Sequence, residues 1–168
     1  QITAKLVNTS NTSVISTLAT ATVSSGLATF TGLDVTLTGN HKIRFESANL
    51  TDLVSDEFEI THGPASQIVF NNSAPTTARS GIVFSPSPTF GLLDQFDNPV
   101  TSGPQFTVTA TVVSANAADV DSLTGASQAS SAGTEIVQFN SLNLTAPEGT
   151  YQLRFTATDG TDSFYVET

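Results

Sequence analysis

Apolar and polar residues alternate along short segments of this chain, which is the pattern of strands that have one buried and one solvated face. The first segment, 1–7, places Ile2, Ala4 and Leu6 on one face and polar side chains on the other. Turn-forming residues separate the further strands that this pattern predicts, at 17–23, 27–30, 33–37, 41–46, 57–61, 66–71, 81–84, 89–96, 106–113, 135–139, 142–144, 151–158 and 161–168. Nowhere does a helical period persist. The pattern therefore predicts an all-β chain of antiparallel sandwiches.

The stretch 27–45 is repeated by the stretch 135–155, with one residue inserted between the two halves. The large apolar, glycine and arginine positions correspond, and the matching pairs are Phe30 with Phe139, Leu33 with Leu142, Gly39 with Gly149, Arg44 with Arg154 and Phe45 with Phe155. The opening strand also recurs, because Val108 begins an alternating run in the same way as Ile2. A repeat on the scale of a small domain indicates a tandem array.

His62, Gly63 and Pro64 mark the boundary between two units. Proline lacks the N–H that a strand needs and glycine frees the backbone, so no strand continues through this interdomain linker. We therefore predict that residues 1–63 are the C-terminal part of an immunoglobulin-like sandwich and that residues 64–168 are a complete one.

The first unit has no counterpart of residues 65–106, which open the second unit. Two early strands are therefore missing, and we expect an uncovered apolar face and unpaired backbone at a sheet edge. That face carries Phe30, Leu33, Ile43, Phe45 and Phe58. Two explanations stay open. Either the chain is a segment of a longer tandem protein, or a neighbouring copy supplies the strands head to tail and builds a fibre.

Composition narrows the classes of function. Hydrophobic residues make up 38% of the chain and charged residues 12%, so the chain is predicted to fold. The net charge of -10 leaves no basic surface for the phosphates of nucleic acid. The absence of cysteine excludes disulfides and thiol chemistry. No apolar run is long enough for a membrane span, and Gln1 begins no signal peptide, so we expect a segment of a longer protein.

The residues that could perform catalysis have simpler interpretations. His41 falls on the inward phase of its strand, where we expect a half-buried side chain at the edge of the core. His62 lies in the linker, away from any recurring Ser and Asp pairing. Asp56, Glu57 and Glu59 flank a closing strand and alternate outward, as solvated side chains do. The sequence therefore predicts that the chain is not an enzyme and needs no cofactor.

Asp94, Asp97 and Asn98 cluster in one turn and offer the oxygen ligands that calcium prefers. Their spacing does not match an EF-hand loop, and turn chemistry explains Asp-Asn-Pro without an ion, so we favour the turn over a metal site. Sequons compatible with N-glycosylation, which also arise by chance in a chain rich in Ser and Thr, occur at Asn8, Asn11, Asn49, Asn71 and Asn143.

Four motifs resemble the bacterial immunoglobulin-like tandem repeats of large surface proteins, including those related to invasin and intimin. They are Gly91-Leu-Leu-Asp-Gln-Phe-Asp-Asn-Pro-Val100, Phe106-Thr-Val-Thr-Ala, Ile136-Val-Gln-Phe-Asn-Ser-Leu and Gly149-Thr-Tyr-Gln-Leu-Arg-Phe. Leu27-Ala-Thr-Phe-Thr-Gly-Leu and Phe58-Glu-Ile-Thr-His-Gly-Pro-Ala are similar to the closing half of such a repeat. Asp97 stands where the family usually has glycine. The resemblance implies an extracellular stalk or adhesin of many repeats, and it carries over no catalytic residue.

We therefore expect a non-enzymatic structural repeat of a stalk, adhesin or filament at the cell surface. Its partners would be neighbouring repeats of the same protein and other copies in a fibre. The alternative is a carbohydrate- or ligand-binding module, which would present flat aromatic side chains to solvent. Tyr165, on the outward phase of the last strand, is the one residue that qualifies. A glycan array without hits would favour the structural interpretation.

Overall fold

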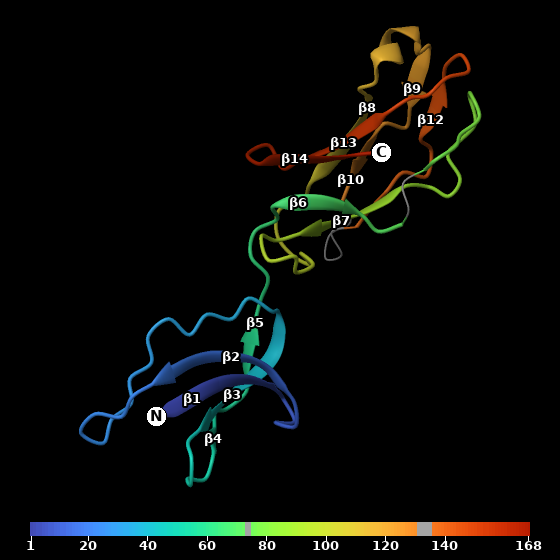
Figure 1. Ribbon diagram of the computed structural model, residues 1–168. Coiled ribbons are helices and arrows are strands. Elements are labelled where there is room, and N and C mark those ends of the chain that lie inside the picture. Colours follow the sequence, from blue (N-terminus) through green and yellow to red (C-terminus); the bar gives the residue numbers. More distant parts are fainter. Residues whose placement is uncertain (73–74, 131–135) are drawn as a thin grey trace. The chain divides into compact units, whose positions relative to one another are not determined.

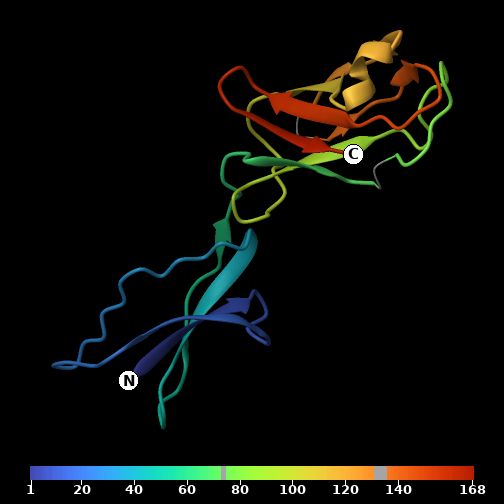
Figure 2. The same cartoon turned by 45° about the horizontal axis from the view of Figure 1, so that its top comes forward.

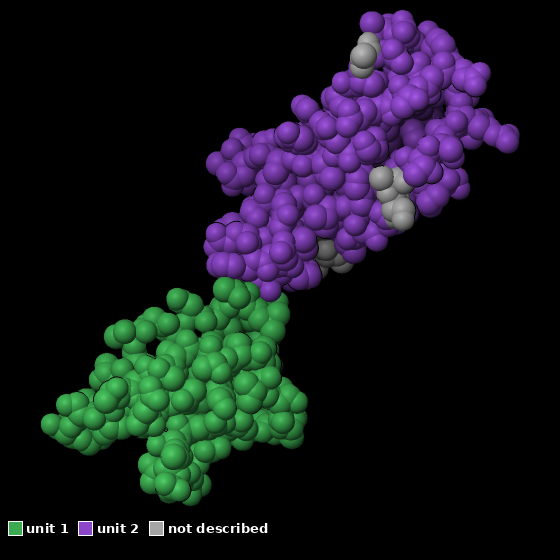
Figure 3. Space-filling model, in the orientation of Figure 1, with its two compact units in different colours: residues 1–61 green, residues 62–168 purple. Residues whose placement is uncertain are grey.

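The computed structural model describes residues 1–72, 75–130 and 136–168 (Figure 1). The chain is all-β, as predicted, and its strands pair in the antiparallel sense throughout the described residues. Helical structure in the described part is limited to one 3-10 turn, η1 (Ala115–Asp119). Contacts divide the chain into unit 1, Gln1–Thr61, and unit 2, His62–Thr168, which Figure 3 colours separately.

Unit 1 is a single sheet. Its strands are β2 (Val14–Ala21), β1 (Ile2–Asn8), β3 (Gly39–Glu46) and β4 (Leu53–Val54), in that order, and β5 (Phe58–Ile60) also pairs with β3. The register places Ala4 opposite Phe45 and Leu6 opposite Ile43, so the apolar positions share one face. The outward face carries ion pairs, in which Lys5 and Arg44 both contact Glu46. The apolar and polar residues that alternate in the sequence therefore lie on opposite faces of this sheet, and unit 1 consists of this one layer.

The segment between β2 and β3 forms no strand, so the predictions of strands at 27–30 and 33–37 are wrong (Figures 1 and 2). Its β pairing in the structure is a single bridge between Ser24 and Leu27. The physical reason is the lack of a partner. In unit 2 the matching residues Val137 and Gln138 are held in a strand by a neighbouring strand that unit 1 does not contain.

Unit 2 contains three sheets. The first has β10 (Ser127–Ala129), β8 (Thr107–Val112), β13 (Leu153–Thr158) and β14 (Ser163–Glu167), and the second has β11 (Val137–Gln138), β7 (Thr89–Leu93) and β6 (Gln67–Phe70). The third pairs β12 (Asn143–Thr145) with β9 (Ser122–Thr124). Side chains of the first two sheets meet in one core, with Phe90 and Leu92 on one side and Phe155 and Ala157 on the other. Unit 2 is therefore a β-sandwich, and unit 1 has only one of its two layers.

Three phenylalanine rings are the largest fully buried side chains of unit 2. The ring centroid of Phe90 lies 4.5 Å from that of Phe155 and 5.7 Å from that of Phe139, and the last two lie 5.4 Å apart. Phe70 adds a fourth ring, 4.7 Å from Phe90. Tilted and edge-on pairs at such separations stabilise a core beyond the area that they bury.

One turn prediction in unit 2 needs correction. A type I′ turn at Asp159-Gly160 is wrong, because Thr158 pairs with Ser163 and a longer loop joins β13 to β14. The Asp159 carboxylate accepts hydrogen bonds from the N–H groups of Thr161 and Asp162, at 2.8 Å each, and these bonds hold the wider loop.

The other strand predictions of unit 2 differ in their bounds. Segment 81–84 forms a bridge from Val83 to Asn143 in place of a strand. Of the predicted strand 135–139, the structure shows β11, and residue 135 lies outside the described residues. The sequence did not predict η1, β9 or β10, which lie in a polar stretch with one large apolar residue, Leu123.

Candidate docking face of unit 1

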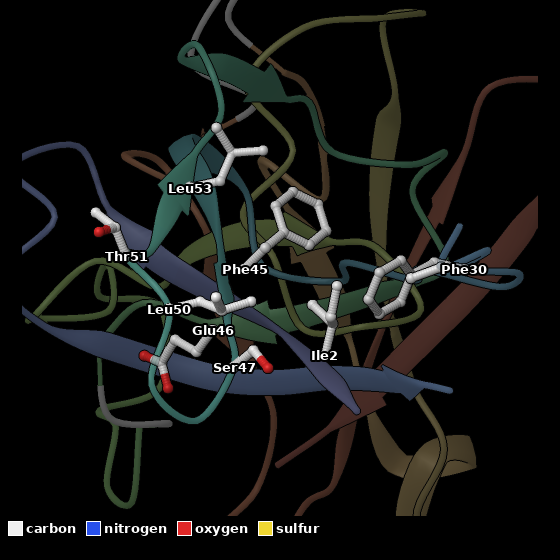
Figure 4. Close-up of a pocket in the computed structure, with 9 residues that line it drawn as sticks. Ile2, Phe30, Phe45, Glu46, Ser47, Leu50, Thr51 and Leu53 are labelled. Carbon is white, nitrogen blue, oxygen red and sulfur yellow. The ribbon is translucent and has the colours of Figure 1, made fainter. Parts of the chain in front are cut away.

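An apolar hollow of about 370 Å³ opens on the uncovered face of the unit 1 sheet (Figure 4). We call it the unit 1 socket, and its lining residues are Ile2, Ala28, Phe30, Phe45, Glu46, Ser47, Leu50, Thr51 and Leu53. β1 supplies Ile2, β3 supplies Phe45, and the strandless segment after β2 supplies Phe30. Leu50 and Leu53 are each 68% exposed. The sheet thus presents large apolar side chains to solvent where a globular domain would bury them.

The socket corresponds to one half of a core that is present in complete form in unit 2. The rings of Phe30 and Phe45 lie 5.4 Å apart, the same separation as between their counterparts Phe139 and Phe155. Phe139 and Phe155 are 0% exposed, whereas Phe30 and Phe45 are only half-buried. Among the described ring contacts, those of Phe155 with Phe70 and Phe90 have no equivalent at Phe45. The sequence prediction of an uncovered face is therefore confirmed at these side chains.

Asp94, one of the three calcium candidates, is 1% exposed and holds a network of N–H donors. Its carboxylate accepts hydrogen bonds from the backbone N–H of Gly63 at 2.9 Å, of Phe96 at 2.8 Å and of Asn98 at 3.0 Å. The Asn98 amide donates to both carboxylate oxygens. Burial alone would raise the pKa of Asp94, but these donors together hold that pKa well below its ordinary value. The donors occupy lone pairs that a cation would need.

Asp97, the second calcium candidate, helps to form the backbone turn. Asp97 has a φ of 65°, a left-handed conformation that suits glycine, and aspartate tolerates it better than most residues do. Its carboxylate accepts a hydrogen bond from the side-chain amide of Gln67 at 2.6 Å. No group of three or more His, Asp or Glu in the described part of the chain is placed to hold a metal ion. The preference for a turn over a metal site stays a prediction, which the hydrogen bonds around Asp94 support and which a calcium titration tests.

The predicted linker residues His62 and Gly63 are tied to unit 2. The Nε2 atom of His62 lies 2.9 Å from the Ser102 hydroxyl, and the Gly63 N–H donates to Asp94 as described above. Sequence reasoning missed this connection, because Gly63 and Asp94 are far apart in the chain. The available signal was the acidic residue directly after a strand, which is a common place for a carboxylate that caps backbone N–H groups.

Among the remaining candidates for chemistry, Asp56, Glu57 and Glu59 are exposed, whereas His41 is buried rather than half-buried as predicted. His41 is 5% exposed, and its Nε2 atom lies 3.0 Å from the backbone oxygen of Leu37. Tyr165 is 59% exposed, but the Arg154 guanidinium lies 4.4 Å above its ring and pairs with Glu167 at 2.7 Å. One face of the ring is therefore covered by a cation rather than free to stack on a sugar.

The structure places the five sequons differently. Asn49 and Asn71 are exposed, while Asn8 and Asn11 are half-buried. The Asn8 side chain accepts hydrogen bonds from the N–H groups of the loop that follows it, Thr12 at 2.9 Å and Ser13 at 3.2 Å. Asn143 lies within β12. A glycan would project most easily from the two exposed positions.

Comparisons with known proteins identify no family for this chain. No family model matches it, and no curated protein matches it. A solved structure described as "Biofilm associated protein - BSP domain" is similar over 97% of this chain, at 21% sequence identity and a TM-score of 0.29. The chain spans 23% of the length of that structure. Within the described residues, no helix is both long and apolar enough to cross a membrane.

Proposed function

We propose that this chain is a non-enzymatic structural segment of an extracellular stalk, adhesin or filament. One observation carries the proposal: the same sheet is built in both units, β1 and β3 in unit 1 and β8 and β13 in unit 2. Most of the positions that repeat between the units are apolar, and they include the ring pairs Phe30–Phe45 and Phe139–Phe155. A chain whose repeated residues build cores, rather than a cluster of polar groups, supports a structural role.

The surface of the chain suits an exposed, repetitive protein. The net charge is -10, with five Lys and Arg residues against fifteen Asp and Glu residues. A net charge of one sign keeps copies of a protein apart and soluble. Contacts other than those through specific faces, such as the unit 1 socket, are therefore disfavoured.

Electron microscopy of the native assembly tests this proposal. We expect successive small domains of similar size along an extended particle, attached to a cell surface or released from it. The control is a glycan array probed with the purified chain. A structural role predicts no hits, even though the Tyr165 and Phe96 side chains are 59% and 52% exposed. A compact isolated particle, or specific glycan binding that a Tyr165→Ala substitution abolishes, would contradict the structural role and support the binding module.

A further inference from the structure

We propose that the unit 1 socket receives a pair of β-strands like β6 and β7, and that the strand in contact with the socket carries a phenylalanine at the position of Phe90. The strand belongs to a segment patterned like residues 64–106 and joined to β1, as that segment is joined to β8 in unit 2. The inference rests on the proposed function, because it treats the two units as repeats of one tandem array. The occupant is thus a pair of β-strands with one aromatic anchor residue.

Unit 2 shows what fills the equivalent space. Phe90 is 0% exposed and packs against Phe139 and Phe155, whose counterparts Phe30 and Phe45 line the unit 1 socket. One further lining residue corresponds as well. Ile2 stands in the place of Val108, and Val108 is also 0% exposed. An aromatic side chain in the socket would convert the two-ring contact of unit 1 into the three-ring cluster of unit 2.

The backbone of unit 1 offers the register for this strand. In unit 2, Val137 is opposite Phe90 and Gln138 is opposite Thr89 in an antiparallel pair. The residues of unit 1 that match Val137 and Gln138 are Ala28 and Thr29, which belong to no strand. A strand that adds its backbone to a free segment gains affinity from main-chain hydrogen bonds and specificity from side chains in pockets. Ala28, which lines the socket, would then lie opposite the incoming phenylalanine.

A second strand would cover the exposed leucine at the mouth of the socket. Leu53 is opposite Phe45, as Val166 is opposite Phe155. In unit 2, β6 lies against β14, and Val166 is half-buried against the core. Leu53 is 68% exposed, which matches the lack of a strand equivalent to β6. The occupant is therefore a β6–β7 pair rather than one strand.

An intact second copy of this chain has no such pair to spare. Its β6 and β7 strands hold Ile68, Phe90 and Leu92 in the core of unit 2, at 3%, 0% and 2% exposure. Donating them would open that core, at a cost of several buried apolar side chains. The occupant is therefore a further segment of this type, and exchange between identical copies becomes an outcome of the test.

The experiment adds the missing segment to the chain. Residues 64–106 are fused directly ahead of Gln1, because Phe106 directly precedes the counterpart of Gln1 in unit 2. Hydrogen exchange is then followed by mass spectrometry for peptides that cover 22–38 and β3. We expect exchange of these peptides to slow by about tenfold or more in the fusion, because new pairing and burial suppress local opening. Peptides from β13 should be unchanged and serve as the internal control.

A matched fusion carries Phe90→Ala in the added segment only, so that unit 2 stays intact. We expect this variant to lose most of the slowing. Unchanged exchange in the first fusion, or equal slowing in both fusions, would overturn the proposal. So would slowing in the original chain that grows with protein concentration, since a second copy would then cover the socket. The exchange experiment tests only the occupant of the socket, so its failure does not contradict the proposed stalk, which microscopy of the native assembly tests. A negative result in microscopy would likewise leave the exchange result unchanged.

Discussion

Replacing Phe155 or Phe45 with alanine removes the same ring from equivalent positions of the two units, and the two costs should differ. Phe155 is 0% exposed and has ring partners at 4.5, 5.4 and 5.8 Å. A buried phenylalanine removes about 150–250 Å² from water, which at ~25 cal/mol per Å² corresponds to roughly 4–6 kcal/mol. Core Phe→Ala substitutions cost about 3–5 kcal/mol. We therefore expect Phe155→Ala to lower the free energy of unfolding of unit 2 by about that amount.

Phe45 has one ring partner in the described residues, Phe30 at 5.4 Å, and is only half-buried. The free energy gained by burying the Phe45 ring is accordingly smaller, and its removal from the open socket leaves no closed cavity. We expect Phe45→Ala to lower the free energy of unfolding of unit 1 by about 1–2 kcal/mol, which is less than the cost at Phe155.

Urea unfolding followed by two probes separates the units. Both tyrosines, Tyr151 and Tyr165, belong to unit 2, and the chain has no tryptophan, so tyrosine fluorescence reports unit 2 alone. Far-ultraviolet circular dichroism reports both units. Phe155→Ala should move the fluorescence midpoint to lower urea, and Phe45→Ala should leave that midpoint in place. Equal costs for the two substitutions would refute the reasoning, since Phe45 would then already lie in a closed core.

Three further substitutions or additions have defined outcomes. Gly125→Ala should destabilise unit 2 by more than about 1 kcal/mol, because φ is +66° and the added Cβ would lie 2.4 Å from the Ser141 backbone oxygen. Gly160→Ala, which has open space around its Cβ position, should cost less. Thermal unfolding of the two variants compares these costs. Asp94→Asn should destabilise unit 2 at pH 7. The pKa of Asp94 is depressed in the folded state, so this carboxylate stabilises unit 2 above the ordinary pKa of aspartate and stops doing so as pH falls through the depressed value. The difference in unfolding free energy between the variant and the parent should therefore shrink on acidification. Urea midpoints measured over a range of pH would show this. Calcium or a chelator should leave the melting temperature unchanged, because N–H donors occupy the Asp94 carboxylate, and a rise with calcium would contradict this assignment.

Periodicity predicted most of the longer strands but missed the two- and three-residue strands β4, β9 and β10, although these also have partners inside the chain. β1, β3, β6, β8 and β13 all lie within one or two residues of the predicted segments, because their alternation is enforced by a buried face. The same rule failed at 27–37, where the alternation is equally regular. A strand is defined by its hydrogen-bonded neighbour, and no strand in the described part of the chain pairs with this segment.

The candidate site was predictable as a consequence of the repeat, not as a motif. Aligning Ile2 with Val108 showed that unit 1 has no counterpart of residues 65–106, and this was sufficient to predict an uncovered apolar face. The volume and lining of the socket depend on where the strandless segment places Phe30, which alternation does not determine. The bond from Gly63 to Asp94 was also beyond the sequence, because it joins residues on either side of β6 and β7.

The Asp94 carboxylate sets how unit 2 would respond to a pulling force. Tension that enters along the polypeptide from Thr61 reaches Gly63 before it reaches β6. There the bond to Asp94 passes part of the force to the turn behind β7, so that β6 is not simply peeled from its neighbour one hydrogen bond after another. Protonation of that carboxylate would remove this connection, but the depressed pKa of Asp94 keeps it charged well below the ordinary pKa of aspartate.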